Sequence, residues 1–445
     1  MAPYQFPAEL SSWIAMFALT LDPRVQQMLM PLFVGVLFGR ERRTVTSWLR
    51  VLEVGEDFER WYRFLGSVGR AVDRIAKKLI LLLLSRLPIG ERVLFALDDS
   101  PTKRYGPKVE GAGVHHNPTP GPANQKHLYG HVWVTIALVC RHAHWGTIAL
   151  PIMARLYVRI INLPVLKYKY GWQFRTKLEL GAELVEMLAG WLKHLGKSVW
   201  VVADGAYCKR EFLRRAAAAG VIVVSRLRKD AALFDTPPKT VSGKRGRGRP
   251  RIYGKNRISL AKRAGQSRGW KTIEVVLYGE RVVKRYKSFL ATYPPAGGLI
   301  LVVLVKNDDG SWVAFCCTDT TASVADVLEA VADRSGIEQV FHDVKEVHGS
   351  GQQQLRNVWR NVAAWNMNLW MYTLTELWAW DRPASELRDR SDSPWDDPSR
   401  RPSHANRCNA LRGQSLEMVI SQHCRTLSLP AKIVELIGRL AKRAA

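Results

Sequence analysis

The sequence has no cysteine pair of the Cys-x-x-Cys type and no apolar run long enough to cross a bilayer. Its six cysteines are scattered through 445 residues, which excludes a disulfide framework or a zinc ribbon and is typical of a reducing compartment. The longest apolar stretches, Met28 to Phe38 and Leu79 to Leu84, fall short of the roughly 18–20 residues that a spanning helix needs. Glu9 precedes the first basic residue, Arg24, so the basic start of a signal peptide is missing. We therefore expect a cytoplasmic protein with no membrane partner.

Acidic residues are too few to balance the basic ones. Lys and Arg number 66 and Asp and Glu number 39, which gives a formal net charge of +27 at pH 7. Apolar residues make up 47% and charged residues 24%, a globular composition that excludes a largely disordered chain. A surplus of this size predicts a polyanionic partner, with nucleic acid as the first expectation and a membrane surface as the alternative.

The N-terminal 88 residues have apolar residues at helical spacing, with basic residues interleaved from Arg40 onward. Residues 1–88 are therefore predicted to form a helical DNA-binding region. Within it, residues 39–50, which include Arg43, could form a turn and a recognition-type helix, or a plain helix with a basic edge.

The rest of the chain divides by its pattern into four parts. Residues 89–230 alternate strands and helices and predict the first part of an α/β core with a mixed sheet. Residues 231–318 contain a basic loop followed by several probable strands, and residues 319–382 return to helix and complete the core. Residues 383–445 are predicted to be a linker, rich in Pro, Ser, Asp and Arg to about residue 410, and a helical tail.

Two apolar strands of the predicted core lead into carboxylates. Val93–Leu97 precedes Asp98 and Asp99, and Ser198–Ala203 precedes Asp204. Because ligands of α/β sheets bind at the carboxyl ends of strands, Asp98 and Asp204 would share a cleft if their strands are neighbours. Carboxylate oxygens suit Mg²⁺, and two ions about 3.5–4 Å apart can activate a water and stabilise the leaving oxygen of a phosphodiester. The alternative is that both are ordinary turn residues at strand ends.

A third carboxylate lies on the predicted helix 337–345. Its buried face is an apolar stripe of Ile337, Val340, Phe341 and Val344. At about 100° per residue, Glu338 and Lys345 flank this stripe close together. Arg334 falls near the same line if the helix begins early, and it sits in the preceding turn if Ser335 and Gly336 cap the helix. The spacing alone also fits a solvated Glu at a helix border.

The order strand-Asp, strand-Asp, helix-Glu resembles the DDE transposases of bacterial insertion sequences, which share the RNase H-like fold. One branch carries a Tyr-(2)-Arg-(3)-Glu-(6)-Lys signature, and Arg334, Glu338 and Lys345 match three of its four positions, whereas the Tyr position is Val331. The resemblance covers roughly residues 90–365. It implies an RNase H-like core interrupted by a β-rich insertion. It also implies that Asp98, Asp204 and Glu338 are catalytic and bind two Mg²⁺ (or Mn²⁺) ions.

The reaction and the partners also follow from this resemblance. It implies metal-dependent cleavage of the element's ends and strand transfer into target DNA, with Arg334 and Lys345 beside the scissile phosphate. The expected partners are double-stranded DNA, as terminal inverted repeats and as target, and a second copy of the chain, acting at the nucleoid. Two alternatives remain: an RNase H-like nuclease or resolvase that cuts without joining, and a DNA-binding transposase relic without activity.

The first metal ligand has to be chosen between two neighbours. Adjacent strand residues point to opposite faces, so only one of Asp98 and Asp99 can face the ions unless the strand has ended. The family usually places its first Asp directly after the apolar run, followed by a small residue and Ser or Thr. Asp98 fits that position best.

Two other segments are candidate DNA contacts. Arg247-Gly248-Arg249-Pro250, followed by Arg251, resembles the core of an AT-hook for a narrow A·T minor groove, although a basic loop on phosphates fits equally. Residues 167–175, which include Lys169, interleave cations with aromatic rings and suit backbone and unstacked bases; the alternative is a strand-to-helix loop. In the insertion, Trp270 and Trp312 are candidates for holding a flipped base, or are core residues.

Overall fold

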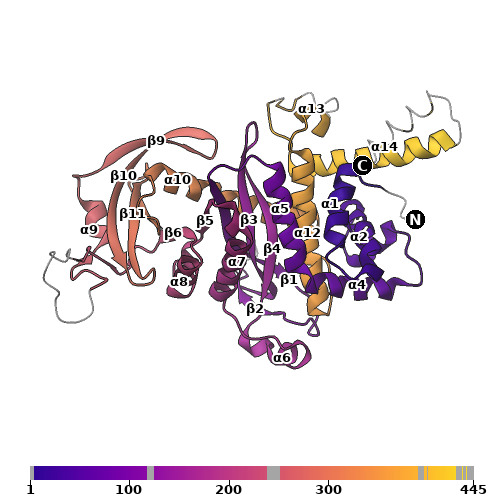
Figure 1. Cartoon of the computed structure of the whole chain (residues 1–445), viewed down its shortest axis with the longest axis horizontal. Helices are drawn as coiled ribbons and strands as arrows, with labels where there is room; N and C mark the ends of the chain where they lie inside the picture. The colour runs from indigo at the N-terminus through magenta and orange to yellow at the C-terminus, as the bar shows by residue number, and fades with distance from the viewer. Residues whose placement is uncertain are drawn as a thin grey trace.

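Figure 1 shows the protein as a computed structural model, with the N-terminal helices at one end and the β-rich segment at the other. The structure describes residues 5–117, 125–237, 251–388, 395–397, 399–426, 433 and 437. None of the helices in these ranges combines the length and the apolar composition that crossing a membrane requires. Arg247 and Arg249 of the AT-hook-like segment lie outside the described residues.

The N-terminal region is helical, as its spacing predicts. Its helices are α1 (Ala8–Ala18), α2 (Leu29–Phe38), α3 (Val45–Val51), α4 (Phe58–Arg70) and α5 (Val72–Arg86). They pack against α12 (Val358–Ala379) and against a strand of the sheet, and their apolar residues belong to the same hydrophobic cluster as the rest of the chain. The N-terminal helices are thus built onto the core.

The central sheet is mixed. The strand β1 (Arg92–Lys103) runs antiparallel to β3 (His127–His142) on one side and parallel to β5 (Ser198–Ala203) on the other. β3 also pairs with β2 (Gly113–His116) and forms a hairpin with β4 (Gly146–Tyr157). The strand β6 (Ile222–Leu227) continues the parallel part beside β5.

Three helices connect these strands. They are α6 (Pro164–Tyr170), α7 (Lys177–Leu192) and α8 (Arg210–Ala218). The helix α7 begins with a capping box between Thr176 and Glu179, which satisfies otherwise unpaired backbone donors. After one further turn the chain leaves through Gly196, whose φ of 64° suits glycine.

The β-rich segment extends the central sheet. Its elements are β7 (Leu233–Phe234), β8 (Arg257–Ile258), α9 (Leu260–Gly265), β9 (Lys271–Leu277), β10 (Glu280–Tyr293), β11 (Gly298–Lys306) and β12 (Trp312–Cys317). The last of them, β12, pairs with β6, and the twelve strands of the described residues form one sheet. The predicted class, a mixed α/β core with a β-rich insertion and a helical N-terminal region, is confirmed.

The C-terminal part is helical, and it corrects one prediction. Its helices are α10 (Val324–Asp333), α11 (Ser335–Glu346), α12, α13 (Ala384–Leu387) and α14 (His404–Thr426). The predicted linker to about residue 410 is wrong from His404 onward, because α14 begins there. His404, Arg407 and Cys408 are buried, so polar residues that suggested a linker instead form contacts inside the protein.

The extent of β1 was left open by the sequence. The apolar run ends at Leu97, before the two aspartates, but β1 continues to Lys103. Residues from Leu94 to Lys103 pair with β3 throughout. Asp98 and Asp99 therefore lie inside the strand, and their side chains point to opposite faces.

The contact between α4 and α12 depends on the absence of a side chain at Gly69, where an added Cβ would overlap the carbonyl oxygen of Trp359. We expect Gly69→Ala to lower the free energy of unfolding by about 1–3 kcal/mol, because both backbones would have to move apart. The matched control is Gly190→Ala in α7, where a Cβ meets nothing within 4 Å. That variant should gain about 0.5–1 kcal/mol from helix propensity. Urea unfolding measures both, and equal effects would contradict this account of Gly69.

Candidate active site

Parallel pairing brings two predicted carboxylates together. In the register of β1 and β5, Leu97 pairs with Ala203, so Asp98 and Asp204 follow paired residues on neighbouring strands. Such strands lie about 4.8 Å apart. Asp204 leaves the sheet at this point, and its side chain accepts a hydrogen bond from the backbone amide of Ala206. The two aspartates thus lie side by side where the parallel pairing of β1 and β5 ends, as their positions after apolar runs predict.

Arg334 connects Asp98 to the helix that carries Glu338. It lies between α10 and α11, at the N-cap of α11. The helix begins early, at Ser335, and Ser335 and Gly336 lie inside it, so they do not cap it. The guanidinium of Arg334 donates to Asp98 Oδ2 at 2.6 Å and to Glu338 Oε1 at 2.7 Å. One cation therefore bridges two of the three predicted acids.

The three acids line one cavity of about 1230 Å³. Asp98 is mostly buried, with 19% of its side chain exposed, whereas 59% of the Glu338 side chain is exposed. Among the described residues, the oxygens of the three acids do not all lie within 4.8 Å of one another. As they stand, the three acids therefore do not form a closed cage around a single ion.

The donor set fits hard divalent cations. All three residues offer carboxylate oxygens, the ligands that Mg²⁺ prefers, and the Arg334 guanidinium already holds positive charge between two of them. Burial raises the pKa of Asp98 to about 6, against the opposing effects of Arg334 and the Asp99 amide, and the carboxylates of Asp99 and Asp204 add to the rise. A bound cation would relieve this crowding of negative charge.

Asp99 faces away from this cluster. Its carboxylate pairs with Lys177 of α7 at 2.6 Å and accepts a hydrogen bond from the Tyr207 hydroxyl at 3.4 Å. Adjacent strand residues alternate between faces, so α7 and α11 cover opposite faces of β1. The geometry favours Asp98 over Asp99 as the residue that meets Arg334 and Glu338.

Lys345 lies on the same side of the sheet as Asp98. Its Nζ donates to Ser100 Oγ at 2.7 Å, and Ser100 is two residues after Asp98 on β1. Burial lowers the pKa of Lys345, which makes it a desolvated cation that would gain from a nearby phosphate. Arg334, Glu338 and Lys345 all line the cavity, as the spacing of their side chains predicts.

The other predicted DNA contacts lie in different parts of the structure and have different partners. Lys169 is on α6, not in a strand-to-helix loop, and pairs with Glu110 at 2.9 Å. The backbone amide of Arg43 donates a hydrogen bond to Gln352 Oε1 at 2.8 Å. The neighbouring Arg42 lines the cavity. Arg251 is exposed.

The two candidate tryptophans carry cations over their rings. Lys287 lies 4.8 Å from the Trp270 ring centroid, and Lys229 lies 5.2 Å from that of Trp312. Both tryptophans are partly buried against the hydrophobic core. They contribute to packing in this structure, and neither lines the cavity that contains the acids.

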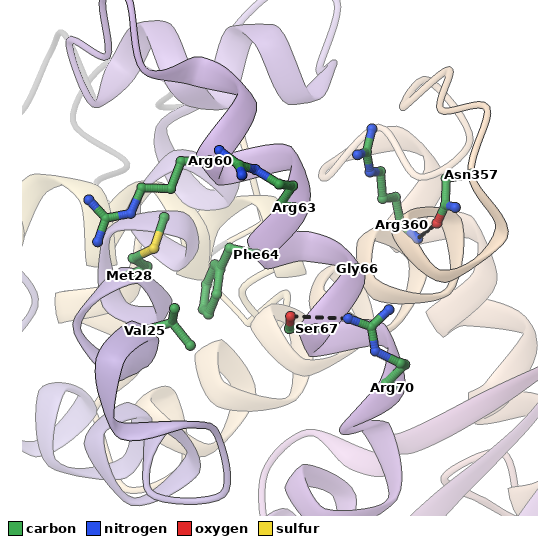
Figure 2. Close-up of a pocket in the computed structure, with 10 residues that line it drawn as sticks. All are labelled: Val25, Met28, Arg60, Arg63, Phe64, Gly66, Ser67, Arg70, Asn357 and Arg360. Atoms are coloured by element: carbon green, nitrogen blue, oxygen red, sulfur yellow. Dashed lines mark hydrogen bonds between the residues drawn. The ribbon is translucent and has the colours of Figure 1, made fainter.

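An arginine-lined pocket was not predicted from the sequence. Figure 2 shows this cavity of about 560 Å³, with Arg60, Arg63 and Arg70 of α4 on one side and Arg360 of α12 on the other. Its lining, among the residues that the structure describes, includes no carboxylate. The signal in the sequence is the spacing of Arg60, Arg63, Ser67 and Arg70, which places basic and polar side chains on one face of a helix.

Comparison with known proteins gives one family match. The model of a family described as DDE superfamily endonuclease matches residues 24–276, more than half of the chain. This stretch contains Asp98 and Asp204 and ends before Glu338. No curated protein matches the chain. Among solved structures, the synaptic complex of piggyBac transposase with hairpin DNA is similar over 96% of this chain and 75% of that chain, with 12% identity and a TM-score of 0.38.

The raised pKa of Asp98 predicts a stability effect in the presence of a chelator. The folded pKa is about 6 and the unfolded value about 3.9, so between these pH values the folded protein keeps a proton that the unfolded chain loses. Stability therefore falls as pH rises through this window. Above it, the ionised carboxylate costs about 2–3 kcal/mol, which Asp98→Asn should recover.

Thermal unfolding at neutral pH with a chelator checks this expectation. The matched control is Asp99→Asn, which loses the pair with Lys177 and should not become more stable. A lower melting temperature for Asp98→Asn than for wild type would contradict the assigned electrostatics.

Proposed function

Because the chain belongs to the DDE superfamily endonucleases, we propose that it is the transposase of a bacterial insertion sequence. In this proposal it cleaves the ends of its element and joins the freed 3′ ends to target DNA. The observation that carries the proposal is the convergence of Asp98, Asp204 and Glu338 on one cavity, with Arg334 between two of them. The spacing of Arg334, Glu338 and Lys345 supports the branch with the Tyr-Arg-Glu-Lys signature, although Val331 replaces the tyrosine.

Asp98, Asp204 and Glu338 would hold the divalent ions that DDE endonucleases require, two Mg²⁺ or Mn²⁺ in this proposal. When bound, such ions activate an attacking oxygen and neutralise the charge that develops on the leaving oxygen. The protein's own contribution is to hold three carboxylates from two strands and one helix at fixed positions. Asp98 must be ionised to serve as a ligand, which the raised pKa opposes until a cation is near.

Arg334 and Lys345 would contact the phosphate. Once cations neutralise Asp98 and Glu338, the guanidinium of Arg334 no longer has to balance both carboxylates, and its planar donors can bind two phosphate oxygens. Lys345 is a compact charge within reach of the same cavity. These two residues would orient the scissile bond and stabilise the negative charge of its transition state.

Double-stranded DNA would extend from the cavity over basic surface. The net charge of +27 supports a polyanionic substrate. The arginine pocket of Figure 2, formed by α4 and α12, offers four guanidinium groups without a carboxylate among its lining residues. We assign it to the backbone of the element's terminal repeats, and expect two chains to pair two ends at the nucleoid.

Glu338→Gln should abolish Mg²⁺-dependent nicking of end-containing DNA and preserve DNA binding. Loss of a metal ligand removes several kcal/mol of transition-state stabilisation, or about 1,000-fold or more in rate. The matched control is Asp343→Asn on the same helix, which does not line the cavity and should retain activity. Nicking by Glu338→Gln at the wild-type rate would overturn the proposed triad. Wild-type cleavage with no joined products, on DNA containing the element's inverted repeats, would favour a nuclease or resolvase.

The double variant Arg63→Ala/Arg70→Ala should bind end-containing DNA more weakly. Each lost phosphate contact reduces the slope of log K against log salt by about 0.9, so the slope should decrease by about 2. Arg24→Ala is the control, because Arg24 is exposed and already paired with Asp22. Fluorescence anisotropy across a salt series measures the slope, and an unchanged slope in the double variant would remove the pocket from the DNA path.

A further inference from the structure

A second cluster of metal-ligand side chains lies away from the acidic cavity. His348 follows α11, whereas His404 and Cys408 are four residues apart on α14 and so share one face of that helix. The Nε2 atoms of the two histidines are 2.8 Å apart. Cys408 Sγ lies 3.4 Å from His404 Nε2 and 3.9 Å from His348 Nε2. In the described part of the chain, this is the only group of three such ligand atoms within 4.8 Å of one another.

All three side chains are buried, and their surroundings fix one of the rings. The Glu376 carboxylate of α12 faces His404 Nδ1 at 2.7 Å and also pairs with Arg407. The carboxylate accepts a hydrogen bond from the Nδ1–H of His404, so Nε2 is the atom of this ring that faces His348 and Cys408. A carboxylate behind a histidine is the usual second partner of a metal-bound imidazole.

A stacked aromatic ring also holds His404 in place. The ring of Tyr372 stacks on His404, with centroids 4.1 Å apart, which restricts the orientation of that ligand further.

The distances suit a small tetrahedral ion. With Zn–N of about 2.0–2.1 Å and Zn–S of about 2.3 Å, tetrahedral angles place two nitrogens about 3.3 Å apart and a nitrogen and sulfur about 3.6 Å apart. The observed separations of 2.8, 3.4 and 3.9 Å differ from these by about half an ångström or less. A shift of that size is available to side chains through small χ rotations.

We propose that His348, His404 and Cys408 bind one Zn²⁺ ion, with a solvent molecule in the fourth position. Mixed nitrogen and thiolate ligands favour zinc over magnesium, so this site is chemically distinct from the acidic cavity. Zn²⁺ would displace the thiol proton of Cys408 to solvent. The positive charges of Zn²⁺ and Arg407 would then balance the negative charges of the Cys408 thiolate and the Glu376 carboxylate. The ion would cross-link α14 to the segment that directly follows α11. α11 is the helix that carries Glu338.

Elemental analysis of the purified full-length protein tests the site. Expression with added zinc, followed by gel filtration, should give about one zinc per chain. His348→Ala and Cys408→Ser should each retain at least about 10-fold less zinc under the same conditions. The matched control is Cys424→Ser, which changes a buried cysteine of the same helix outside the cluster and should keep its zinc.

Cobalt substitution gives a second readout that needs no variant. Wild-type protein loaded with Co²⁺ should show a thiolate-to-cobalt charge-transfer band, and Cys408→Ser should lack it. Wild-type protein without retained zinc and without that band would overturn the site, as would equal zinc in Cys408→Ser and wild type. Because no DNA is present, the result is independent of transposition: Glu338→Gln should bind zinc as wild type does.

Discussion

Asp98 is a mostly buried carboxylate whose burial opposes its ionisation, and the acidic cavity is arranged around that constraint. β1 and β5 are held in register by their hydrogen bonds, so Asp98 cannot move away from Asp204 without breaking the sheet. Arg334 provides the compensating charge, because its guanidinium donates to both Asp98 and Glu338. The position of α11 on the sheet therefore depends on these ion pairs as well as on its buried apolar residues.

The alternation of side chains along β1 gives the neighbouring residue, Asp99, a different environment. Asp99 points to the other face of β1, where Lys177 neutralises it. The two adjacent side chains thus have different partners, although the Asp99 carboxylate still adds to the raised pKa of Asp98. One stays in a stable ion pair, and the other remains in a crowded, partly desolvated position where its pKa is raised. Such a difference between adjacent carboxylates is common where one of them is functional.

Much of this arrangement could be predicted from local patterns. Apolar runs before Asp98 and Asp204, and the helical spacing of Glu338 and Lys345, depend only on neighbouring residues. Two features could not be predicted in this way. The continuation of β1 to Lys103 depends on pairing with β3, and the burial of His404, Arg407 and Cys408 depends on Glu376, a partner about thirty residues away in sequence. Both depend on contacts that composition does not encode.

The pairing of β12 with β6 has a consequence for how the protein is made. Residues 222–227 and 312–317 are neighbours in the sheet, and Asp98 meets Arg334 across 236 positions of sequence. A nascent chain emerging from the ribosome therefore holds two aspartates long before their helical counterpart is synthesised. Folding of such distant contacts is slow, and the incomplete chain exposes unpaired strand edges meanwhile. The three acids can come together only after about three-quarters of the chain has been synthesised, because Glu338 is residue 338 of 445.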